Sequence, residues 1–138
     1  ADPGLGSGYM IAQYTSAALV NESRSLGRAA TDNTPVSGGQ EDHVSMSAGA
    51  AMHARTAVEN AATVVGVELL CGAQALEYVD DDLSPGDGSA AAVDAVREVA
   101  PPLNADRQLS PEMDAVGTLV RSGLLAERVE GAVDDALA

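Results

Sequence analysis

Four side chains able to do chemistry stand together in SGGQEDHVSM, residues 37–46. Gln40, Glu41, Asp42 and His43 follow a Gly-Gly pair and precede a long helical pattern. Carboxylates and imidazoles exchange protons, bind metal ions or orient a polar substrate. Three interpretations follow: a solvated helix start, a metal site, or one wall of an active site.

The spacing of the acidic and histidine residues does not favour a metal site. Adjacent side chains on a helix point about 100° apart, so three in a row rarely converge on one ion. His53 is not one helical turn from His43, so the two do not form a metal-binding pair. Counted from Asp80, an EF-hand loop would need Gly and Glu where Pro85 and Ala91 stand. We therefore expect no metal ion.

The helix-start interpretation is stronger. Acidic residues in a first helical turn are stabilised by the helix dipole, which alone explains Asp42. The sequence offers no catalytic triad and no phosphate-binding Gly loop. Local chemistry therefore leaves both a helix start and a catalytic Glu41 open.

Two helical patterns must position this segment. The first runs from Met10 to Glu22, and the irregular stretch that follows is rich in turn-forming residues. The second runs from about Asp42 to Tyr78. The apolar stripe of the first includes Met10, Tyr14, Ala17 or Ala18, and Leu19; that of the second is Val58, Ala62, Val65, Leu69, Ala73 and Leu76.

Shorter helices follow. Pro101 and Pro102 end a helix that begins near Ser89, and Ser110-Pro111-Glu112 predicts a capped helix start, with an end near Gly123. A last amphipathic stretch carries Leu125, Val129, Val133 and Leu137. No alternating strand pattern occurs, so we predict one all-α domain, residues 1–138.

The length of the second helix suggests a larger assembly. A helix of 35 residues would extend about 52 Å, whereas a globule of 138 residues is only about 37 Å across. We therefore expect either a kink near a Gly or membership of a larger bundle. The absence of Phe and Trp, with Ala, Val and Leu as packing residues, also suggests close helix packing within something larger.

The net charge of −14, with no Lys, restricts the partners and the environment. Nucleic acid and anionic membranes would repel such a surface. The acidic excess is typical of adaptation to a salty cytoplasm; the alternative is an ordinary acidic protein with skewed codon usage.

Cys71 is the only cysteine, and we expect it to be a small buried packing residue. Since no signal-peptide pattern is present either, we expect a cytoplasmic location. The apolar run of residues 61–76 contains Glu68 and Gln74, so it reads as a core helix rather than a membrane span.

Two longer segments carry a family resemblance. SGYMIAQYTSAALVNE (residues 7–22), then QEDHVSM (residues 40–46), resemble the C-terminal part of histidine ammonia-lyases, in the family that also contains phenylalanine and tyrosine ammonia-lyases. VVGVELLCGAQALEY, LSPGDG and AVREVAPPLNADRQLSPEM follow in the same order, so the resemblance covers nearly the whole chain. It implies the long-helix bundle of the fumarase/aspartase-like ammonia-lyase fold, with shorter C-terminal helices, in a homotetramer. It also implies histidine degradation, by elimination of ammonia from L-histidine to give urocanate.

The electrophile of this family is a methylidene-imidazolone ring formed from an internal Ala-Ser-Gly. That tripeptide does not occur here, and Val36-Ser37-Gly38 is only a near match. The family's electrophile and its tyrosine base belong to an N-terminal region. We therefore expect residues 1–138 to be the C-terminal helical segment of such a lyase, inactive alone, and to work as a homotetramer or with a complementing N-terminal chain.

The resemblance assigns two residues to the substrate site. Glu41 matches the active-site glutamate whose carboxylate faces the substrate imidazole, and Met10 matches a pocket-lining methionine. It assigns no role to Gln40. Two alternatives stay open: a non-catalytic helical assembly module left by gene decay, and a lyase of the same family for another aromatic amino acid.

Overall fold

Helices form the whole regular architecture of the described chain. The computed structural model describes residues 5–28, 30–31, 35–41, 43–79 and 82–133. Within those ranges there is no strand, and an isolated bridge pairs Val36 with Glu41. The elements are α1 (Met10–Ser25), the 3₁₀ turn η1 (Ser37–Gly39), α2 (Ser47–Leu76), α3 (Asp87–Val99), α4 (Ser110–Arg121) and α5 (Leu124–Ala132). The all-α prediction is confirmed.

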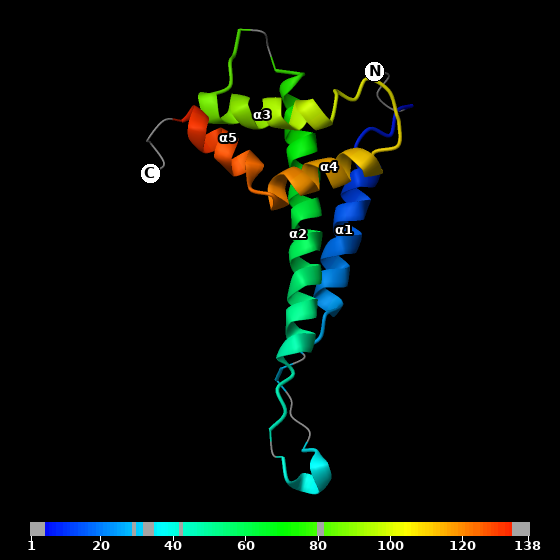
Figure 1. The fold of residues 1–138 in the computed structure, drawn as a ribbon. Coiled ribbons are helices and arrows are strands. Elements are labelled where there is room, and N and C mark those ends of the chain that lie inside the picture. The colour runs from blue at the N-terminus through cyan, green and yellow to red at the C-terminus, as the bar shows by residue number, and fades with distance from the viewer. Residues whose placement is uncertain (1–4, 29, 32–34, 42, 80–81, 134–138) are drawn as a thin grey trace.

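The long helix α2 is the axis of the molecule. Its 30 residues span about 45 Å, and α1 lies along it with the opposite chain direction (Figure 1). Helices α3 and α4 cross the upper part of α2, and α5 packs against α3. The helix passes through Gly66 and Gly72 without interruption. The expected kink near a Gly therefore does not occur.

The start of α2 differs from the prediction. The helix begins at Ser47, after Met46 as its N-cap residue, and not near Asp42. The backbone of Glu41 is paired with Val36 instead, and residues 43–46 then lead into the helix. Asp42 itself lies outside the described residues. Tight-turn chemistry in the preceding Gly-Gly segment therefore overrides the helical pattern there.

Small residues let the helices approach closely. A Cβ added to Gly66 on α2 would lie 2.9 Å from the backbone nitrogen of Gly117 on α4. Leu70, Val96 and Val116 are the largest fully buried side chains. The core cluster is built from Ala12, Val67, Leu70, Ala73, Val96, Ala100, Leu103, Leu109, Met113 and Val116. The predicted packing by Ala, Val and Leu is confirmed.

The predicted apolar stripes of α1 and α2 are only partly buried. On α1 the buried residue is Ala12, whereas Met10 and Tyr14 are 53% and 61% exposed. On α2, Ala62 and Ala73 are buried, but Val58, Val65 and Leu76 are exposed. Periodicity identifies residues that share a face but not what that face contacts. Among the predicted stripe residues of α2, the two alanines are covered, whereas these larger side chains remain uncovered in this chain.

Two smaller expectations concern helix ends. Ser110 is the first residue of α4 and makes no cap hydrogen bond, so the predicted capping hydroxyl is wrong; the N-cap residue is Leu109. Gly123 ends α4 in the left-handed conformation, with φ of 82°, as the predicted stop requires. Val133 follows α5, and Leu137 lies outside the described residues.

In the described part of the chain, no helix is long and apolar enough to cross a membrane.

Candidate functional site

A tight turn holds the backbone of Glu41. The Val36 N–H donates to the Glu41 carbonyl at 3.2 Å, and the Glu41 N–H donates back to the Val36 carbonyl at 3.3 Å. Between them, Ser37, Gly38 and Gly39 have φ of 58°, 66° and 83°. Glycine adopts these left-handed values without strain, whereas Ser37 pays a conformational cost. The Gly-Gly pair is therefore what lets the chain reverse and present Glu41.

The Glu41 side chain is available to a partner. The residue is exposed, and within the described residues no ion pair involves its carboxylate. It does not lie at the start of α2, which begins at Ser47, so the helix-start interpretation is wrong for Glu41. In the same described part, no group of three His, Cys, Asp or Glu side chains is suited to a metal ion.

Side chains on α2 fix the base of the loop that carries Glu41. The Nδ1 of His53 lies 2.9 Å from the carbonyl oxygen of Gly27, just after α1. The buried Asn60 donates through Nδ2 to the Glu22 carboxylate at 2.8 Å and to the Ser23 hydroxyl at 3.2 Å. This role of Asn60 was not predicted, although an amide within an apolar helical run is a signal for a buried hydrogen-bond partner.

Met10 lies at the other end of α1 as its first residue. The loop before it is held by the Asp106 carboxylate, which accepts the N–H of Ser7 at 2.7 Å and of Gly8 at 2.9 Å. These two bonds hold the pKa of Asp106 below its usual range. Tyr9 packs against the core cluster, and burial, with the nearby charge of Glu112, raises the pKa of its phenol.

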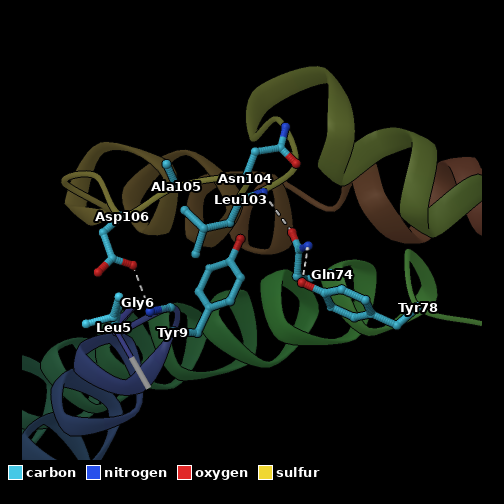
Figure 2. Close-up of a pocket in the computed structure, with 10 residues that line it drawn as sticks. Leu5, Gly6, Tyr9, Gln74, Tyr78, Leu103, Asn104, Ala105 and Asp106 are labelled. Atoms are coloured by element: carbon cyan, nitrogen blue, oxygen red, sulfur yellow. Dashed lines mark hydrogen bonds between the residues drawn. The ribbon is translucent and has the colours of Figure 1, made fainter. Parts of the chain in front are cut away.

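A cavity of about 520 Å³ opens beside this loop (Figure 2). Its walls come from the N-terminal loop, the end of α2 and the segment between α3 and α4. Gln74 Oε1 accepts the Leu103 N–H at 2.7 Å, which joins α2 to that segment. Neither Met10 nor Glu41 lines this cavity, so it is not the predicted substrate site.

The two predicted site residues do not meet within one chain. Met10 begins α1, whereas Glu41 lies in the loop beyond the opposite end of that helix (Figure 1). The 16 residues of α1 extend about 24 Å. A pocket that contains both residues therefore requires Met10 from one copy of this chain and Glu41 from another.

The chain does not contain the precursor of the family's electrophile. No Ala-Ser-Gly occurs in the printed sequence. The near match Val36-Ser37-Gly38 is part of the turn that holds Glu41, and the Ser37 carbonyl there accepts the Gln40 N–H at 3.3 Å. Residues 1–138 thus do not fit the formation of a methylidene-imidazolone ring.

Comparison with known proteins gives the family. The model of the family described as aromatic amino acid lyase matches residues 1–98. The chain is 62% identical to the "Probable histidine ammonia-lyase" of Halobacterium salinarum over 99% of its own length and 26% of that protein. It is 45% identical to the histidine ammonia-lyase of Gloeobacter violaceus, over 94% of this chain and 25% of that one. The chain thus spans about a quarter of the length of these curated relatives.

Solved structures agree on the fold. The crystal structure of histidine ammonia-lyase from Trypanosoma cruzi superposes with a TM-score of 0.89, at 35% identity, over 98% of this chain and 27% of that one. A tyrosine aminomutase from Streptomyces globisporus superposes with a TM-score of 0.90, at 34% identity, over 100% of this chain and 26% of the other. The helices described above therefore have the arrangement of this lyase fold. The chain belongs to the aromatic amino acid lyase family.

Proposed function

We propose that residues 1–138 supply a substrate-contacting wall of an ammonia-lyase that converts L-histidine to urocanate. The observation that carries the proposal is the exposed Glu41 carboxylate on a backbone turn closed by reciprocal hydrogen bonds with Val36. The 62% identity to a probable histidine ammonia-lyase supports the choice of reaction.

Glu41 would select the substrate by its charge. A carboxylate accepts an imidazole N–H and favours a protonated ring, whereas a phenyl ring offers no donor. Once a pocket closes, an unpaired carboxylate costs binding free energy, which disfavours phenylalanine. Met10 would line the same pocket as an apolar, adaptable surface. Glu41 therefore contributes selectivity and electrostatic stabilisation, and Met10 contributes shape.

The pocket would form between polypeptides. Met10 and Glu41 lie at opposite ends of α1, and large apolar side chains on α1 and α2 remain exposed, among them Met10, Ile11, Tyr14, Met52 and Val58. Both features support a homotetramer or a complex with a chain that carries the electrophile and the base. The charge of −14 and the Halobacterium relative support a salt-adapted cytoplasm as the working environment.

A substrate panel tests the proposal. The gene product that carries residues 1–138 should release urocanate from L-histidine, detected by its near-ultraviolet absorbance, and little or no cinnamate from L-phenylalanine. The purified 138-residue chain should release neither, because it lacks Ala-Ser-Gly. Preferential deamination of phenylalanine or tyrosine would favour the same-family alternative. Inactivity of the full gene product toward all three would favour the non-catalytic assembly module.

A further inference from the structure

The N-terminal loop that leads into Met10 is held by a residue far away in the sequence. Asp106 lies in the segment between α3 and α4 and accepts the N–H groups of Ser7 and Gly8 at 2.7 and 2.9 Å. Figure 2 shows the Asp106 carboxylate turned toward this loop. Gly8 has a φ of +54°, so the loop turns through a conformation that most side chains disfavour.

The segment that carries Asp106 is itself fixed. Arg107 donates to both oxygens of the Glu112 carboxylate at 2.7 and 3.1 Å, and to the carbonyls of Pro101 and Pro102 at 2.6 and 3.1 Å. This guanidinium ties the segment to the first turn of α4. Asp106 is therefore carried by a segment with its own hydrogen bonds to Glu112, Pro101 and Pro102, although its side chain is exposed.

Ala12 in the core cluster and Tyr9 packed against it hold the start of α1 by apolar contact, but few hydrogen bonds fix the residues before Ala12. The N-cap residue, Tyr9, makes no side-chain cap hydrogen bond. The backbone N–H of Met10 donates only to the Ser7 carbonyl at 3.1 Å, and Ser7 is one of the two residues that Asp106 holds. A displacement of Ser7 and Gly8 would therefore shift Met10, whose N–H is bound to Ser7, while Ala12 stays packed in the core.

We infer that Asp106 is a positioning residue, which sets the place of Met10 in the substrate pocket through the Ser7–Gly8 backbone. The inference rests on the proposed function, because it takes Met10 to line that pocket. Asp106 does not touch the substrate. Its loss would loosen the fit to the substrate and leave the reacting groups, which lie elsewhere, in place.

Two variants and one matched control separate the contributions. Asp106→Ala removes both acceptors, whereas Asp106→Asn keeps one carbonyl oxygen and so one of the two bonds. Asp114→Asn removes the same charge from an exposed position of α4 and is the control. All three are made in the gene product that carries residues 1–138.

Amide hydrogen exchange reports on the anchor. The Ser7 and Gly8 amides should exchange about tenfold faster in Asp106→Ala, since a hydrogen bond to a charged group contributes on the order of one decade in an equilibrium. Asp106→Asn should lie between, and Asp114→Asn should match the unaltered protein. Unchanged exchange in Asp106→Ala would mean that no anchor exists and would overturn the inference.

Kinetics report on the positioning. Asp106→Ala should raise KM for L-histidine about three- to tenfold, with kcat within about twofold. In a Met10→Ala background, Asp106→Ala should add no further change in KM, because the two residues act through one contact. Faster exchange with an unchanged KM, or a full effect of Asp106→Ala in that background, would overturn the inference. If the unaltered gene product releases no urocanate, the proposed function fails and the positioning role with it, while the exchange result still decides whether the anchor exists.

Discussion

The crossing of α2 and α4 makes Gly66 a sensitive position. A Cβ at residue 66 would lie 2.9 Å from the Gly117 nitrogen, 3.3 Å from the Gly117 Cα and 3.4 Å from the Val116 carbonyl carbon. All three atoms are backbone, so no side chain can rotate away. Non-bonded atoms prefer separations of about 3.5–4.0 Å. In Gly66→Ala, α4 would therefore have to withdraw by roughly 0.5–1 Å.

The cost of this withdrawal can be separated from helix propensity. Overpacking a core costs about 1–3 kcal/mol, whereas Gly→Ala within a helix gains about 1 kcal/mol. Gly72 lies on the same helix, is exposed and has no atom within 4 Å of an added Cβ. Gly72→Ala therefore receives the same propensity gain without the clash. The difference in unfolding free energy between the two variants measures the clash alone, about 1–3 kcal/mol.

Thermal unfolding in molar salt, followed by circular dichroism, measures that difference. For a chain of 138 residues, about 1 kcal/mol corresponds to roughly 3–4 °C, so Gly66→Ala should melt about 3–12 °C below Gly72→Ala. Equal melting temperatures for the two variants would show that α2 and α4 do not approach each other as described.

Three further predictions follow from charge and burial. Burial raises the pKa of the Cys71 thiol, so iodoacetamide at pH 8 should modify the native chain more slowly than the urea-unfolded chain; equal rates would contradict the packing of Cys71 against the core. The Ser7 and Gly8 N–H groups lower the pKa of Asp106 from its ordinary 3.8, so the stability that Asp106 contributes is complete above pH 3.8 and is lost as the pH falls through the lower pKa of the folded state. The difference in unfolding free energy between the unaltered protein and Asp106→Asn, measured by urea unfolding, should therefore shrink between pH 7 and pH 3. A difference that does not depend on pH would refute the anchor. With 21 acidic and 7 basic residues, the helical signal should rise from dilute buffer to molar salt, because screening relieves self-repulsion; a constant signal would count against salt adaptation.

Helix positions were predictable where residue chemistry dictates an end. Pro101 and Pro102 follow α3, and Gly123 closes α4 in a left-handed conformation. The start of α2 was not predictable from apolar spacing. The Ser37–Gly39 turn and the Val36–Glu41 bridge precede the helix, which begins only at Ser47. Local turn chemistry there outweighs periodicity.

The site was predictable only in part. Glu41 and Met10 came from family resemblance, and their role remains a prediction. Nothing in local spacing indicates that Asp106 holds Ser7 and Gly8, because that contact joins positions almost a hundred residues apart.

Glu41→Gln in the gene product that carries residues 1–138 tests the central claim most directly. Gln keeps the size and the hydrogen-bonding capacity of the side chain but removes its charge, and the Val36–Glu41 turn depends only on backbone groups. Urocanate formation from L-histidine should fall by about 10²–10⁴, with the oligomeric state unchanged by size-exclusion chromatography. Near-normal turnover in Glu41→Gln, or a larger loss in Asp42→Asn, would show that Glu41 is not the carboxylate that meets the substrate.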